Sequence, residues 1–308
     1  VFALYDPFRI VIDTRGPTRE SASTTPEGEG ESASSGQPSS SPSGTAPLPG
    51  SGAAPAPTAN GDWTLTRTLG LKVGKVVIDP GHGGKDTGTI GPSGLREKDL
   101  VLSVALKLRD LLEDRLNTEV ILTRDSDRFI PLEERTAIAN QQGADLFISV
   151  HANASRNRKA SGIETYILSF ATSDAEREVA SRENASSQRN IRELEDLLKK
   201  IAMEDFNQES RDLAHAVQTE LFSELLQERP RQKNRGIKQA PFIVLIGSNM
   251  PSILTEIGFI SNPDDETYYR SAEAHDQVAE ALYKGVESYF RSLGTLPAAG
   301  PVSAATGR

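Results

Sequence analysis

The chain has 308 residues, 36% of them hydrophobic, and a formal net charge of −9 at pH 7; this acidic balance argues against a nucleic-acid-binding protein, which normally carries a basic surface. Because there are no cysteines, disulfide bonds and thiolate-bound metals are excluded, and a transition metal would have to be bound by histidine and carboxylate side chains. No apolar run reaches the length of a membrane-spanning helix, so no transmembrane segment is expected.

The N-terminal region is expected to be mostly unfolded. A strand-like run covers Arg9–Asp13, but a lone strand cannot bury itself. Residues 15–61 are rich in Ser, Pro, Gly and Ala; such a segment cannot offset its ordering entropy, so we expect a flexible linker. Trp63 is expected to anchor this linker to a folded domain spanning residues 62–294, and the small, polar tail 295–308 to be disordered.

Strands and helices alternate along the folded part. Apolar β-branched runs predict strands, and apolar residues at helical spacing predict helices. The strands are expected at 75–79, 119–123, 145–150, 162–168, 242–246 and 252–256, and the helices near 98–116, 131–142, 174–203, 211–227 and 273–293. This alternation predicts an α/β fold, with a twisted, mostly parallel sheet covered by helices on both faces. The helices within about 171–232 would form a helical insertion beside the active site.

Three predicted strands run into a residue that can bind a metal or transfer a proton: His82 in a glycine-rich turn, His151, and Glu256. In open α/β sheets the ligand crevice lies outside the carboxyl ends of the strands, so we expect these residues to converge. Glu97 begins the first long helix. Two histidines and a carboxylate would suit a catalytic zinc, which keeps its fourth place for water. Taken singly, each histidine could be structural, and Glu97 could simply be favoured by the helix dipole.

Four motifs then resemble the signatures of the zinc-dependent N-acetylmuramoyl-L-alanine amidases. They are Asp-Pro-Gly-His-Gly-Gly at 79–84, Arg-Glu-Lys-Asp at 96–99, Ser-Val-His-Ala-Asn at 149–153 and Thr-Glu-Ile-Gly-Phe-Ile-Ser-Asn at 255–262. The likeness covers about residues 74–293. It implies that His82, Glu97 and His151 bind one Zn²⁺ and that Glu256 is the catalytic acid/base.

The resemblance also implies a reaction and a location. The enzyme would hydrolyse the amide bond between N-acetylmuramic acid and L-alanine in peptidoglycan, in the periplasm or cell envelope, for cell-wall remodelling or daughter-cell separation. We expect a monomer whose export signal lies outside this chain. Two other functions stay open: a zinc peptidase or other amide hydrolase, which the ligand set alone cannot distinguish, and a non-catalytic peptidoglycan-binding protein, against which the intact motifs argue.

Several further polar residues are candidates for supporting roles. Asn153 is expected either to hydrogen-bond near the metal or to cap a turn. Glu164, on a predicted strand, is a candidate for contacting substrate or metal. Arg135 and Asn140 resemble the family pattern and are expected to orient loops. The two remaining histidines are expected to be surface or packing residues: His215 and His275.

The insertion carries a further resemblance. Ala-Ser-Arg-Glu-Asn-Ala-Ser at 180–186 is similar to a segment of the periplasmic cell-division amidases, whose corresponding helix lies over the active site until an activator of the degenerate LytM type removes it. This implies that Glu183, or the neighbouring Glu178, occupies the open zinc position at rest, with the apolar stripe Ile191–Ile201 as the activator's contact. The alternative is an ordinary amphipathic helix without a gating role.

The N-terminus carries a second resemblance. Asp-Pro-Phe-Arg-Ile-Val-Ile-Asp at 6–13 is similar to the end of the AMIN module, a small β domain found ahead of cell-wall amidases. This implies that residues 1–14 are the end of a truncated AMIN-like domain. The alternative is an ordinary N-terminal extension.

Overall fold

The structure is a computed structural model that describes residues 2–5, 8–11, 55–58, 61, 64–68, 73–187, 206–294 and 296. Most of the predicted linker, almost all of the tail, Trp63 and the stripe Ile191–Ile201 lie outside these residues. The chain divides into two units, residues 1–47 and 48–308. In the first unit, β1 (Phe2–Tyr5) and β2 (Phe8–Val11) pair as an antiparallel hairpin. The expected lone strand therefore has a partner, and its assignment to an AMIN-like domain stays a prediction.

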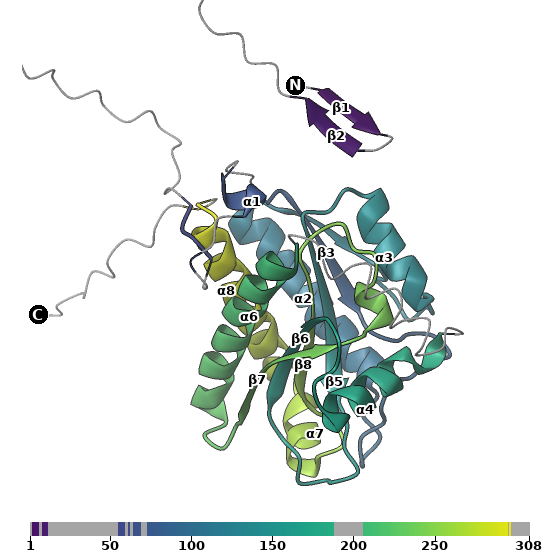
Figure 1. Ribbon diagram of the computed structural model, residues 1–308. Coiled ribbons are helices and arrows are strands. Elements are labelled where there is room, and N and C mark those ends of the chain that lie inside the picture. The colour runs from purple at the N-terminus through teal and green to yellow at the C-terminus, as the bar shows by residue number, and fades with distance from the viewer. Residues whose placement is uncertain are drawn as a thin grey trace, which may run out of the picture. The chain divides into compact units, whose positions relative to one another are not determined.

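The second unit is built on a six-stranded sheet (Figure 1). Its strands, in spatial order, are β4 (Glu119–Leu122), β3 (Lys75–Pro80), β5 (Leu146–Asn153), β8 (Ser252–Phe259), β6 (Ile163–Leu168) and β7 (Asn234–Ala240). All neighbouring pairs are parallel except β6 and β8, which are antiparallel. The predicted α/β fold with a mostly parallel sheet is confirmed.

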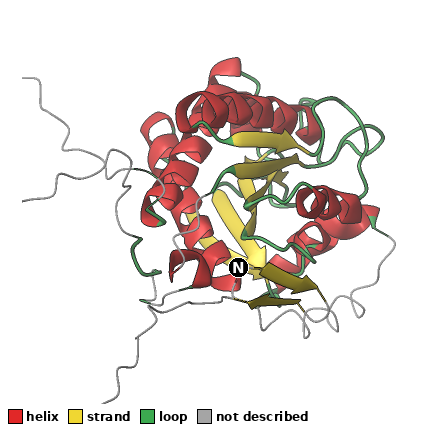
Figure 2. Cartoon of the chain, turned by 90° about the horizontal axis from the view of Figure 1, so that it is seen from above, coloured by secondary structure: helices red, strands yellow, loops and turns green. Residues whose placement is uncertain are grey.

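Helices cover both faces of the sheet (Figure 2). One face is covered by α2 (Glu97–Leu116), α6 (Phe206–Glu228) and α8 (Ala272–Ser292). The other is covered by α3 (Leu132–Gln141), α4 (Asp174–Glu183) and the 3₁₀ turn η2 (Ile243–Leu245). The remaining short helices within the described residues are α1 (Leu65–Thr68), η1 (Asn184–Ser186) and α7 (Pro263–Tyr269). Among the described residues, no helix is both long and apolar enough to cross a membrane.

The two cores follow from the alternation of side chains along each strand. Val76 and Ile78 of β3 are fully buried in the core beneath α2, α6 and α8, whereas Val77 between them is buried in the core beneath α3 and α4. Successive strand residues point to opposite faces, so a strand covered on both sides must be apolar throughout. Burying each such side chain contributes about 1.5–3 kcal/mol, which holds the strand ends, and the residues that follow them, in place.

One predicted strand is wrong. Residues 243–245 form the 3₁₀ turn η2, and the strand lies earlier, at Asn234–Ala240. The turn is apolar because its three residues are buried in the core beneath α3 and α4. The true strand, β7, reads Asn-Arg-Gly-Ile-Lys-Gln-Ala and is only half buried, since an edge strand has one neighbour. Because most of its residues are polar, a search for apolar runs does not detect this strand.

The predicted helix over 174–203 is also wrong as a continuous element. Within the described residues, α4 ends at Glu183, continues as the 3₁₀ turn η1 and reaches extended backbone at Ser187. A short helix that was not predicted, α7, follows β8. Asn262 caps it by accepting a hydrogen bond from the backbone of Asp264 at 2.8 Å, and a proline occupies its first position.

Candidate metal centre

The turn after β3 places His82 against His151. His82 has a positive φ of 59°, which is uncommon for a residue with a side chain. The rings of His82 and His151 meet edge to face, with centroids 4.9 Å apart. A Cβ at Gly81 would lie 2.3 Å from Cε1 of His151, so only glycine allows this approach. The glycines of the motif therefore serve to bring one histidine beside the other.

Two buried arginines hold this turn. Arg124 donates to two carbonyl oxygens of the turn, at 2.9 and 2.7 Å, and Arg135 donates to the carbonyl of His82 at 2.7 Å. Arg135 also pairs with buried Asp79 at 2.8 Å, and Asp79 accepts hydrogen bonds from the hydroxyls of Thr123 and Ser149. Burial opposes ionisation of Asp79, but Arg135 and the two hydroxyls outweigh it and lower the pKa of the carboxyl. Together, these contacts hold the backbone of His82 in its strained conformation.

Glu97 enters the same space from the first residue of α2. One of its oxygens accepts a hydrogen bond from the backbone of Ala152 and the other from that of Thr89, each at 2.9 Å. A Cβ at Gly88 would lie 2.7 Å from Glu97 and 2.6 Å from His82, so position 88 of this loop also requires glycine. Burial raises the pKa of Glu97, but the charge of His82 and the hydrogen bonds reverse that effect and lower it to about 2.

Four donor atoms converge here: Nε2 of His82, Oε1 of Glu97, Nδ1 of His151 and Oε2 of Glu183. Both imidazole nitrogens lie 3.0–3.2 Å from both carboxylate oxygens. All four side chains are buried, and neither Nε2 of His82 nor Oε2 of Glu183 has a hydrogen-bond partner. Ligand atoms of a tetrahedral ion at 2.0–2.1 Å would be about 3.3 Å apart. The four nitrogen–oxygen distances match this spacing, and all four donor atoms lie within 4.8 Å of one another, so the cluster could hold one metal ion.

The surroundings of the cluster favour a positive charge at its centre. Burial lowers the pKa of His151, but Glu183 and Glu97 reverse this and raise it to about 9. The other ring nitrogen of His82 lies 3.1 Å from Asp86, which accepts a hydrogen bond from the backbone of Gly88 at 3.1 Å. A carboxylate on the far nitrogen orients a metal-binding histidine. Sequence reasoning missed Asp86, although its position four residues after His82 in the same loop was a usable signal.

Glu183 reaches the cluster from the last residue of α4. The neighbouring Arg182 donates to the carbonyl of Ala154 at 2.6 Å and to the side chain of Asn153 at 2.8 Å, and it pairs with the second oxygen of Glu183 at 3.2 Å. Glu178, on the same helix, is exposed and outside the cluster. Of the two candidate glutamates, the structure brings only Glu183 to the two histidines.

Both ends of α4 are anchored. Ser173 and Glu176 form a reciprocal capping box at its start. After its end, the Asn184 side chain donates to the carbonyl of Pro241 at 2.8 Å and accepts from the backbone of Ile243 at 2.9 Å. A cavity of about 270 Å³, lined by His82 and Glu183 among others, leads to the cluster along this helix.

Glu256 lies beside the cluster on the neighbouring strand. In the sheet it is opposite His151 on one side and Glu164 on the other. It is fully buried, and neither of its carboxylate oxygens has a hydrogen-bond partner. Burial, and then the charge of Glu183, raise its pKa well above the usual value. A buried, unpartnered carboxylate is costly for the fold and marks a functional group.

Glu164 is differently placed. It accepts hydrogen bonds from Tyr166 at 2.5 Å and Lys238 at 2.6 Å and lies 3.5 Å from Arg235. These contacts balance its charge, and it is not one of the four cluster residues. Its candidacy for touching substrate stays a prediction.

The other predicted residues have structural contacts. The amide of Asn140 bonds to backbone of the 247–249 loop, so it orients a loop as expected. His215 is exposed, and His275 bonds to Ser103 and to the carbonyl of Tyr269, each at 2.8 Å. Both fit the expected surface or packing roles. Asn153, by contrast, has a buried side-chain nitrogen without a partner beside Arg182.

Comparison with known proteins identifies similar chains. A family model described as N-acetylmuramoyl-L-alanine amidase (Amidase_3) matches residues 76–288. The N-acetylmuramoyl-L-alanine amidase AmiC of Escherichia coli O6:H1 is 38% identical over 233 residues, which make up 72% of this chain and 54% of AmiC. AmiA of Escherichia coli K12 is 35% identical over 222 residues, or 70% of this chain and 75% of AmiA. The chain thus spans about half the length of the AmiC relative.

Solved structures show the same likeness. The amidase AmiC2 of Nostoc punctiforme is 33% identical with a TM-score of 0.53, and the match covers 71% of this chain and 97% of that one. The N-acetylmuramoyl-L-alanine amidase of Clostridium difficile 630 is 32% identical with a TM-score of 0.55, covering 72% and 98%.

Proposed function

Because the chain belongs to the N-acetylmuramoyl-L-alanine amidase family, we propose that it hydrolyses the amide bond between N-acetylmuramic acid and L-alanine in peptidoglycan with the help of one zinc ion. The observation that carries this proposal is the buried cluster of two imidazoles and two carboxylates, with the unpartnered Glu256 on the adjacent strand. His82, Glu97 and His151 would hold the ion. Bound zinc lowers the pKa of water and polarises a carbonyl group.

Glu256 is the proposed acid/base. Its two oxygens are free of protein partners, and the charge of a bound zinc ion would lower its raised pKa, so one oxygen can accept a proton from the attacking water. The same carboxyl then returns the proton to the nitrogen of L-alanine, because an amine leaves poorly unless it is protonated. Glu256 lies opposite His151 in the paired strands β5 and β8. This pairing fixes the position of the proposed acid/base relative to the proposed metal ligands.

Glu183 gives the site a second proposed property, which is autoinhibition. Its carboxylate lies 3.2 Å from His82 and 3.0 Å from His151, at the position that water or the scissile carbonyl would need. While α4 is docked, the site would therefore be closed to substrate. An activator of the degenerate LytM type would displace the helix. The alternative is an ordinary amphipathic helix without a gating role, in which case Glu183 would be a permanent part of the cluster.

The substrate implies a place of action in the periplasm or cell envelope, where the enzyme would remodel the wall or separate daughter cells. We propose that it acts as a monomer. A zinc peptidase would share the same ligand set, and a peptidoglycan-binding protein would share the fold. The products distinguish the three functions.

The test is product analysis by mass spectrometry after incubating the zinc-loaded chain, and its Glu183→Gln variant, with purified sacculi. We expect free stem peptides beginning with L-alanine. Glu256→Gln should lower the rate by about 10²- to 10⁴-fold while zinc stoichiometry is unchanged, since Glu256 is outside the ligand set. Trimmed peptides would indicate a peptidase, and the absence of any product from either protein would indicate a binding protein.

A further inference from the structure

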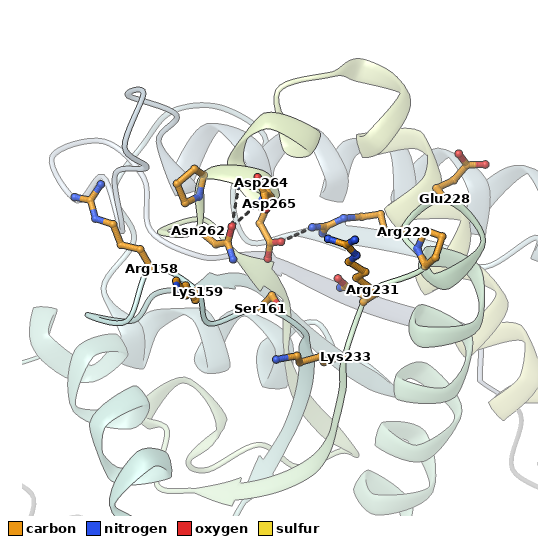
Figure 3. Close-up of a pocket in the computed structure, with 13 residues that line it drawn as sticks. Arg158, Lys159, Ser161, Glu228, Arg229, Arg231, Lys233, Asn262, Asp264 and Asp265 are labelled. Carbon is orange, nitrogen blue, oxygen red and sulfur yellow. Dashed lines mark hydrogen bonds and ion pairs between the residues drawn. The ribbon is translucent and has the colours of Figure 1, made fainter.

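A second cavity, of about 750 Å³, lies outside the cluster (Figure 3). It is lined by the loop 158–161, by residues 228–233 from the last residue of α6 to the start of β7, and by residues 262–265 at the start of α7. We call it the basic cavity. None of the four cluster residues lines it. Its volume is within the range of small-molecule and peptide sites.

The topology places the basic cavity along the same edge of the sheet as the cluster. β8 is parallel to β5, so residues 262–265 follow the strand end that lies beside the end of β5 and His151. β6 is antiparallel to β8 and β7 is parallel to β6, so both strands begin at this edge. The cluster lies over β3, β5 and β8, and the cavity lies over β8, β6 and β7. A ligand extended along this edge could reach both.

Four cationic side chains around the cavity carry uncompensated charge. They are exposed, and within residues 73–187 and 206–294 none of them forms an ion pair: Arg158, Lys159, Arg231 and Lys233. The fifth cation, Arg229, pairs with Asp265 and lies over the ring of Tyr268 at 4.8 Å, as the dashed line to Asp265 in Figure 3 indicates. Even so, one of its terminal nitrogens is buried without a partner.

A buried amide adds a second, independent indication of a ligand. Gln232 lines the cavity and is only 7% exposed, yet neither its side-chain oxygen nor its nitrogen has a hydrogen-bond partner. Leaving such atoms unsatisfied destabilises a fold. A ligand that offers both a donor and an acceptor would satisfy them.

The chemical groups around the cavity restrict the class of ligand that it can bind. The unpaired cations would bind carboxylates or phosphates. However, the cavity also has two exposed acids, Glu228 and Asp264, and the amide of Gln232. A pure polyanion would be repelled by the acids and could not satisfy the amide oxygen. An acidic peptide that also carries N–H groups or an amine fits all three features.

We propose that the basic cavity binds the acidic stem peptide of peptidoglycan and holds it while its L-alanine end lies at the cluster. This inference rests on the proposed function, since that reaction supplies a peptide with free carboxylates, an amine and amide groups. Arg231 and Lys233 would bind the carboxylates, and Gln232 would bind the peptide backbone. They would be specificity residues that do not touch the reacting bond.

The test measures binding of the fluorescently labelled tetrapeptide L-Ala-γ-D-Glu-meso-diaminopimelate-D-Ala to the zinc-loaded full chain by anisotropy. We expect Arg231→Gln with Lys233→Gln to weaken binding by about tenfold or more, and KM for a stem-bearing muropeptide to rise similarly at unchanged kcat. The control, Arg109→Gln with Lys284→Gln, removes the same charge from the α2 and α8 surface, where each cation pairs with a carboxylate, and should change neither quantity.

A second variant separates binding from folding. Gln232→Leu removes the unsatisfied amide, so we expect equal or greater resistance to urea together with weaker tetrapeptide binding. Equal binding by all variants would overturn the inference even if the amidase reaction proceeds. Tetrapeptide binding without hydrolysis would support the inference and refute the proposed function. Tighter, Lys233-dependent binding of poly(glycerol phosphate) would overturn the assignment to a peptide.

Discussion

Replacing Glu183 by glutamine distinguishes a gate from a permanent ligand. The substitution keeps the size of the side chain but removes the charge that faces His82 and His151 at 3.2 and 3.0 Å. Removing one partner of a buried ion pair costs about 3–5 kcal/mol, so the docked state of α4 should lose about 3 kcal/mol or more. At 1.4 kcal/mol per factor of ten, the undocked population would rise about 100-fold if the docked state dominates.

The remaining contacts of α4 still favour the docked helix, and they limit the expected rise in turnover. Arg182 still donates to the Ala154 carbonyl and to Asn153, and Asn184 still bonds on both sides. Part of the lost energy is also retained, because the glutamine oxygen can still accept a hydrogen bond from a histidine ring. We expect basal turnover, measured as dye release from labelled sacculi, to rise between about tenfold and 100-fold.

The control is Glu178→Gln, which removes the same charge from an exposed position of the same helix and should leave turnover unchanged. Zinc stoichiometry is measured in parallel. A fall in both zinc content and turnover of the Glu183→Gln variant would show that Glu183 is a permanent ligand. Unchanged turnover with full zinc would show that α4 does not close the site.

Three further outcomes follow from the contacts of the site. Asp79→Asn leaves a buried arginine unpaired and should lower the free energy of unfolding by about 3–5 kcal/mol, measured in urea against the exposed control Asp110→Asn. The pKa of Asp79 is lowered in the folded state, so ionised Asp79 stabilises the fold fully above its unfolded pKa of about 4. This contribution is lost as the pH falls through the folded pKa. A free energy of unfolding of the wild type that does not change between pH 6 and 3 would contradict this. Gly88→Ala places a Cβ 2.6 Å from His82 and should weaken zinc binding at least about tenfold in chelator competition, whereas Gly94→Ala, also at positive φ but with no neighbour within 4 Å, should leave zinc affinity unchanged. Chelation of the metal should abolish hydrolysis and lower Tm, and zinc should restore both; activity that survives complete removal of zinc would refute the proposed function.

Much of the site could be predicted because its signals are local. His82, His151 and Glu256 each follow or continue an apolar run, and parallel strands bring their carboxyl ends to one edge. The same rule could have found Arg124, which lies two residues after the end of β4 and holds the His82 turn. The alternation of buried strands and amphipathic helices likewise predicted the α/β architecture, since burial on both faces requires continuous apolar strands.

Other features depend on contacts between distant segments. Polar β7 is a strand because the edge of β6 offers it a ladder of hydrogen bonds, and apolar 243–245 is a turn because the core beneath α3 and α4 buries it. Neither is visible in local hydrophobicity.

Which of Glu178 and Glu183 reaches the histidines also depends on contacts between distant segments. Five residues at about 100° each place the two side chains about 140° apart around α4, so only one can face the histidines. The sequence by itself determined the ligand types, their order and the strand ends that bear them. Only the docking of α4 through Arg182 and Asn184 decided which glutamate closes the cluster, because the rotation of a helix about its axis is set by the surface against which it packs.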